Sequence, residues 1–126
     1  MAEILIYKGS KSNCIGRLEN GLVFDSPSSG RDENSSACVG HVDFNGYVYR
    51  KGRVSFSSHT PEHNDCVGRC ERKYIYSDYR KNRDAGSVDL TTGEVYDSRG
   101  NSVGYVKTGS DFLMSCAAGA LLLLLN

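Results

Sequence analysis

Two short patterns of apolar and polar positions alternate along the chain. The first is a small residue, an apolar residue, Gly, a variable residue and a further apolar residue; its copies are Cys14–Leu18, Cys38–Val42, Cys66–Cys70, a degenerate Asp84–Val88, and Ser102–Val106. The second is an aliphatic residue followed by an aromatic one, in Ile6-Tyr7, Val23-Phe24, Val48-Tyr49, Ile75-Tyr76 and Val95-Tyr96. Short runs of this composition indicate strands, and their repetition indicates a repeat architecture. We therefore predict about ten short strands in five repeats.

The connections between these strands are of two kinds. Asn20-Gly21, Asn45-Gly46 and Thr92-Gly93 follow the first pattern closely and predict tight hairpin turns. Most links in the other direction are longer and polar, at 26–36, 50–65 and 77–83. An antiparallel meander with its long loops at one end follows. Pairing of the first strand with the last would remove both open edges and close a barrel.

The C-terminal segment predicts a buried helix. Ser110 or Asp111 is a suitable N-cap, and residues 112–125 carry no charge. This run is shorter than the roughly 20 residues that span a bilayer, and a helix that is apolar on every face must be buried on every face. Alternation along the strands would place the repeated glycines, together with Cys14, Cys38 and Cys66, on one small inward face.

The aromatic residues, with Arg17 and His41, would then face water on the outer side of the strands. The sequence thus predicts a single all-β domain, 1–126, with β repeats in 1–109 and a C-terminal apolar helix, 110–126, in the centre of the barrel. The alternative is a β-sandwich with the helix laid across an open end.

Composition bears on the kind of partner and on the cellular compartment of the protein. The chain has 15 basic and 15 acidic residues, so its net charge gives no reason to expect a nucleic-acid partner. Five cysteines are an odd number, and the N-terminus lacks a basic region followed by a long apolar one. We expect a cytoplasmic protein with no disulfide framework, no membrane span and no cofactor.

The repeated sequence motif is clearest in residues 93–106 and occurs again in 15–24 and 38–49. It resembles the motif of small bacterial repeat proteins of the β-flower kind. Some of these also end in an Ala/Leu-rich tail, as residues 117–125 do here. The resemblance implies a structural repeat of unknown function. The family has no established catalytic residues to carry over to this chain.

His59, His63, Cys66 and Cys70 have the residue types of a zinc site. Cys66 and Cys70 fall on one predicted strand, however, where residues four apart are about 13 Å distant, so one ion could not bind both. We therefore expect no metal here. A small metal-dependent or cysteine hydrolase that uses His59, His63 and Cys66 remains the alternative function.

The long loops carry the candidate binding residues. Tyr79, Arg80 and Arg83 form a basic segment, and Arg53, His59 and His63 lie in the loop before it. Loops on a rigid scaffold often carry function, so we expect a non-enzymatic binding or scaffold module whose partner is a protein or a small anionic ligand. The sequence leaves that partner's identity and the oligomeric state open.

Overall fold

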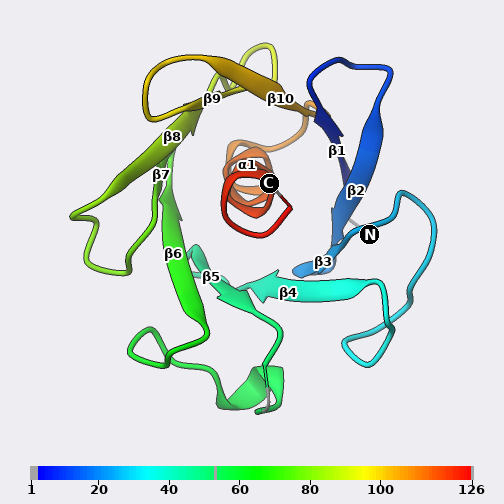
Figure 1. The fold of residues 1–126 in the computed structure, drawn as a ribbon, viewed down its shortest axis with the longest axis vertical. Helices are drawn as coiled ribbons and strands as arrows, with labels where there is room; N and C mark the ends of the chain where they lie inside the picture. Colours follow the sequence, from blue (N-terminus) through cyan, green and yellow to red (C-terminus); the bar gives the residue numbers. More distant parts are fainter. Residues whose placement is uncertain (1–2, 53, 126) are drawn as a thin grey trace.

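The computed structural model describes residues 3–52 and 54–125 and confirms the predicted fold class. Ten antiparallel strands follow one another around a closed barrel, and β1 pairs with β10, with Ile6 opposite Val106 (Figure 1). The strands are β1 (Glu3–Lys8), β2 (Cys14–Glu19), β3 (Leu22–Phe24), β4 (Cys38–Val42), β5 (Tyr47–Arg50), β6 (Cys66–Glu71), β7 (Tyr74–Tyr76), β8 (Asp84–Val88), β9 (Glu94–Asp97) and β10 (Ser102–Val106).

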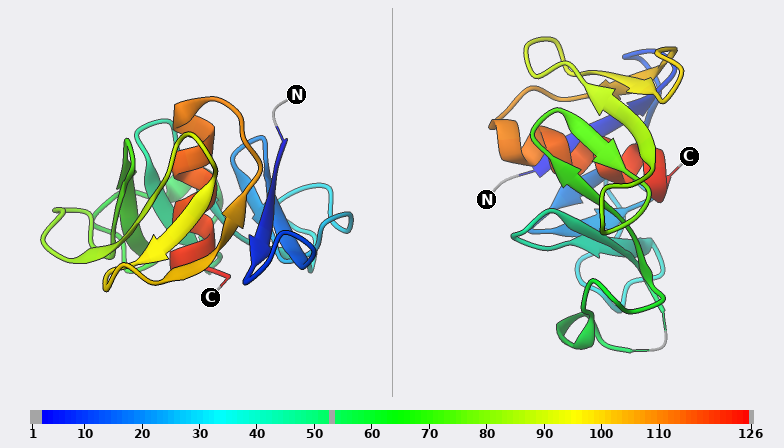
Figure 2. Two further views of the ribbon diagram at one scale, coloured as in Figure 1. Left: turned by 90° about the horizontal axis from the view of Figure 1, so that it is seen from above. Right: turned by 90° about the vertical axis from the view of Figure 1, so that its left-hand side faces the viewer.

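The helix α1 (Asp111–Leu123) runs through the middle of this barrel (Figures 1 and 2). Ser110 is its N-cap: the hydroxyl oxygen accepts a hydrogen bond from the backbone N–H of Leu113 at 3.3 Å. Residues 114–121 are all buried. Within the described residues, no helix has the length and apolar character that crossing a membrane requires.

Five consecutive leucines of the C-terminal segment account for the five copies of the glycine-containing pattern. Each lies against the glycine of one repeat, in reverse order: Leu121 at Gly104, Leu122 at Gly86, Leu123 at Gly68, Leu124 at Gly40 and Leu125 at Gly16. Leu121–Leu123 form the end of α1, and Leu124 and Leu125 continue the chain beyond it, so the five leucines point in different directions from the axis and meet five panels of the wall. A Cβ on any of these glycines would also collide with a carbonyl oxygen of the neighbouring strand.

A β-bulge in every repeat corrects the prediction for the cysteines. The pairing shifts by one residue before each repeated glycine, so Tyr7 lies opposite Cys14 while Ile6 lies opposite Gly16. The extra residue takes the inward position, and the residues that pack on the core are Ile15, Val39, Val67, Ala85 and Val103. The prediction that Cys14, Cys38 and Cys66 share the glycines' inward face is wrong, because a bulge interrupts the two-residue alternation.

The outer face is also more buried than predicted. Phe24 and Tyr49 are each 1% exposed, and Arg17 is 4% exposed. The guanidinium of Arg17 lies over the ring of Phe24 and donates hydrogen bonds to three carbonyls of the loop 26–36. The expectation that these side chains meet water is wrong because the long loops fold back onto the wall and cover them.

Candidate functional site

The loop between β5 and β6 covers Tyr49 and begins the candidate site. It contains the short 3-10 turn η1 (Phe56–Ser58), drawn at the bottom of Figure 1. The imidazole of His41, on the outer face of β4, stacks between the rings of Tyr49 and Phe56, with centroids 4.7 and 4.1 Å away. His59 lies parallel to Tyr49, 4.9 Å from its centroid. The loop is thus attached to the barrel by a stack of flat rings.

A chain of hydrogen bonds crosses this stack. His41 Nε2 lies 2.8 Å from His59 Nδ1, and His59 Nε2 lies 3.1 Å from Asp65 Oδ2. The His59 side chain is fully buried. Burial, with the neighbouring His59, lowers the pKa of His41 to about 4. His41 is therefore neutral at pH 7, and a single proton lies between its Nε2 and His59.

His63 completes a cluster with His59 and Asp65. Its Nδ1 lies 3.6 Å from Asp65 Oδ2 and accepts a hydrogen bond from the backbone N–H of Asp65 at 3.1 Å. One potential ligand atom from each residue lies within 4.8 Å of the others. Across residues 3–52 and 54–125, this is the one such group of three His, Cys, Asp or Glu side chains placed to hold a metal ion.

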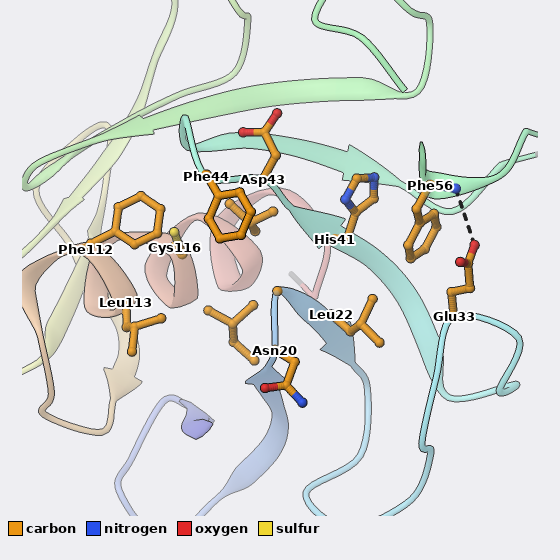
Figure 3. Close-up of a pocket in the computed structure, with 13 residues that line it drawn as sticks. Asn20, Leu22, Glu33, His41, Asp43, Phe44, Phe56, Phe112, Leu113 and Cys116 are labelled. Atoms are coloured by element: carbon orange, nitrogen blue, oxygen red, sulfur yellow. Dashed lines mark hydrogen bonds between the residues drawn. The ribbon is translucent and has the colours of Figure 1, made fainter. Parts of the chain in front are cut away.

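An apolar groove of about 610 Å³ adjoins His41 (Figure 3). It lies between the hairpin turns that follow β2 and β4, the first turn of α1, and the two long loops that fold along the wall. Its apolar lining includes Leu22, Phe56 and Leu113, and two exposed aromatic rings stand at it: Phe44 is 96% exposed and Phe112 is 46% exposed.

The charged groups of this groove are acidic. Glu33 and Asp43 line it, and the Glu33 carboxylate accepts a hydrogen bond from the backbone N–H of Phe56 at 3.3 Å (dashed in Figure 3). The Asp43 carboxylate accepts hydrogen bonds from the backbone N–H groups of Asn45 and Tyr47 and from the hydroxyl of Tyr49. Both carboxylates are therefore fixed in position.

The predicted binding residues divide between two loops. His59 and His63 are brought together, as described above, whereas Arg53 lies outside the described residues. Tyr79, Arg80 and Arg83 lie in the loop between β7 and β8, which leaves the barrel at another point of its circumference (Figure 1). There the Arg80 guanidinium lies over the ring of Tyr79, 5.3 Å from its centroid, and its Nε donates to the Tyr79 hydroxyl.

The cysteines stay apart from this cluster. Cys66 and Cys70 lie on one strand, β6, as predicted. The Cys66 thiol donates to the carbonyl of Gly68, and burial raises its pKa. Cys70 is buried in the core beside Gly119 of α1, and burial raises its pKa well above the ordinary value. Neither thiol is placed or ionised as a nucleophile needs to be.

The sequence reasoning missed His41, Asp65 and the aromatic residues Phe44 and Phe56. One signal pointed to His41: it occupies the variable position of its repeat, where the other repeats have Arg17, Arg69, Ser87 and Tyr105. Asp65 has the residue type of an ordinary surface carboxylate, so the sequence gives no signal for it. Nothing local in the sequence shows that the loop returns to the wall.

No protein-family model, curated protein or solved structure matches the chain.

Proposed function

We propose that the protein is a non-enzymatic binding module whose binding surface is the groove beside β4. Its occupant is an apolar segment of a partner protein that carries a lysine or arginine. The observation that carries the proposal is Phe44, which stands 96% exposed on a hairpin turn at the groove. An aromatic ring this exposed at an apolar groove is typical of a binding anchor.

The charges of the groove support a basic segment. Glu33 and Asp43 are its charged side chains, and His41 is neutral because its pKa is lowered to about 4. A cationic side chain would complement the two carboxylates, and charge complementarity gives an interface its specificity. The same carboxylates would repel the small anionic ligand expected from the sequence, so that expectation is kept only for the separate loop that holds Tyr79 and Arg80.

Two features support binding over hydrolysis. The thiol of Cys66, the nucleophile that the cysteine-hydrolase form of the alternative requires, donates a hydrogen bond to the carbonyl of Gly68 and has a raised pKa. The groove is also held by fixed elements, because the turn of Phe44 is closed by the hydrogen bonds to Asp43. A preformed surface loses little conformational freedom when a partner docks.

Nuclear magnetic resonance with isotope-labelled protein tests this proposal. Three short synthetic peptides would share one apolar core and differ only in flanking Lys, Gln or Glu residues. We expect the Lys peptide to bind most tightly and to shift the amide signals of residues 41–44 and 112–113. Phe44→Ala should weaken binding by at least about tenfold, the loss of one well-placed anchor.

Tyr74→Ala is the matched control, because Tyr74 is also an exposed aromatic residue, 48% exposed, but lies on β7 outside the groove. Equal weakening by both substitutions, tighter binding of the Glu peptide, or signal shifts away from the groove would refute the proposal.

A further inference from the structure

The cluster of His59, His63 and Asp65 does not line the groove, and its residue types are those of metal ligands. Two imidazoles and one carboxylate, two of them partly exposed and one fully buried, meet within the loop between β5 and β6. We propose that these three side chains form a binding site for one Zn²⁺ ion, independent of the ligand in the groove.

The distances fit a tetrahedral ion. Zinc binds imidazole nitrogen and carboxylate oxygen at about 2.0–2.2 Å, so adjacent ligand atoms of a tetrahedral site lie about 3.4 Å apart. Asp65 Oδ2 lies 3.1 Å from His59 Nε2 and 3.6 Å from His63 Nδ1. The third pair, between the two imidazoles, lies within 4.8 Å and needs the largest adjustment. That adjustment is a rotation of His63, the most exposed of the three side chains, and it also releases His63 Nδ1 from the backbone N–H of Asp65.

His41 supplies the partner that a zinc-bound histidine usually has. Such a histidine donates its other ring N–H to an acceptor, which fixes its tautomer and orientation. Without an ion, His59 Nε2 donates to Asp65 Oδ2, and His59 Nδ1, 2.8 Å from His41 Nε2, accepts from it. When Nε2 binds an ion instead, His59 takes the tautomer with its proton on Nδ1, and His41 Nε2 becomes the acceptor. His41 is itself held between Tyr49 and Phe56, so this contact is oriented before any ion arrives.

The site has one closed side and one open side. Gly52 closes it, because a Cβ at that position would collide with the Asp65 carboxylate. His63 and Asp65 are 33% and 22% exposed, which leaves the ion a route of entry. Three protein ligands leave a fourth position for water. All three ligands lie between β5 and β6, so a bound ion would cross-link His59, His63 and Asp65 within this loop, while His59 keeps its contact with His41 on β4.

Isothermal titration of ZnSO₄ into full-length protein free of a histidine tag tests the proposal. We expect one equivalent to bind and Mg²⁺ not to bind. Co²⁺ in place of zinc should give the visible absorption of a tetrahedral site without a thiolate charge-transfer band. Both measurements use the wild-type chain, so their outcome does not depend on whether a variant folds.

Graded variants then locate the site. His63→Ala and Asp65→Asn should abolish stoichiometric binding. His41→Phe keeps a ring in the stack and removes only the acceptor for His59, so it should weaken binding by about 10–100-fold. Cys66→Ser is the matched control and should bind zinc as the wild type does.

Failure to bind one equivalent, a thiolate band in the Co²⁺ spectrum, loss of binding in Cys66→Ser, or undiminished binding in both His63→Ala and Asp65→Asn would each overturn the site. Because no peptide is used, these outcomes leave the proposed function of the groove untouched.

Discussion

Leu121→Ala tests whether the C-terminal helix is enclosed by the barrel. Leu121 is 1% exposed and lies against Gly104 in the wall. Removing three carbon groups costs about 2.4 kcal/mol in transfer free energy at about 0.8 kcal/mol per group. A closed, hydrogen-bonded wall cannot collapse far into the cavity, and the cavity adds to this cost. We expect the free energy of unfolding to fall by about 4 kcal/mol, within the range known for buried leucines.

Urea unfolding followed by circular dichroism measures this loss. With a slope of about 1.5–2 kcal/mol/M, the midpoint should move down by roughly 2 M with little change in slope. Phe112→Ala on the same helix is the control, since Phe112 is 46% exposed, and it should cost only about 1 kcal/mol. If Leu121→Ala costs no more than Phe112→Ala, the helix is not enclosed and the reasoning fails.

Three further predictions follow from individual buried groups. Arg17→Met leaves three loop carbonyls without their donor and should lower the free energy of unfolding by about 3 kcal/mol. Amide hydrogen exchange in residues 26–30 should become faster, and unchanged exchange there would contradict the prediction. The unfolded chain protonates His41 near its ordinary pKa of 6.5 and the folded chain only near about 4, so the folded state binds fewer protons between these values. The free energy of unfolding should therefore fall as pH drops from 6.5 to 4, and a His41→Phe variant with the same slope in urea titrations would refute this cause. Burial raises the pKa of Cys116 to about 12 and raises the pKa of Cys70 well above its ordinary value, so iodoacetamide should alkylate both only after unfolding. Rapid labelling of either thiol in native protein, seen by mass spectrometry, would count against their burial.

The sequence predicts His59 and His63 of the candidate site but not His41 and Asp65, because nothing in the sequence links these last two residues to the site. His41 lies on a strand and His59 in a loop 18 residues later, and their contact forms only because the loop returns to the wall. His59 and His63 are predicted from their residue type, which the sequence displays. Asp65 has the same type as many solvated surface carboxylates, so only its distance from two imidazoles distinguishes it.

The sequence by itself determined the strands, turns and helix of this protein, and it favoured a barrel that encloses the helix. Ser110 caps the helix as its side chain predicts, and Asn20-Gly21 forms a hairpin turn with φ angles of 54° and 80°. Five copies of one hairpin and an uncharged segment too short for a bilayer favour a central helix, which buries every apolar face, over a sandwich with the helix across an open end. These features depend on local preference and on hydrophobic burial, both of which can be read from neighbouring residues.

Only the tertiary structure decided which residues face inward beside each glycine and what covers the outer wall. The β-bulges depend on hydrogen-bond register between strands, so Ile15 rather than Cys14 packs on the core. The burial of Tyr49 and the meeting of His41 with His59 depend on where a long polar loop settles. Contacts between segments distant in sequence set both outcomes, and a two-residue alternation contains no information about them.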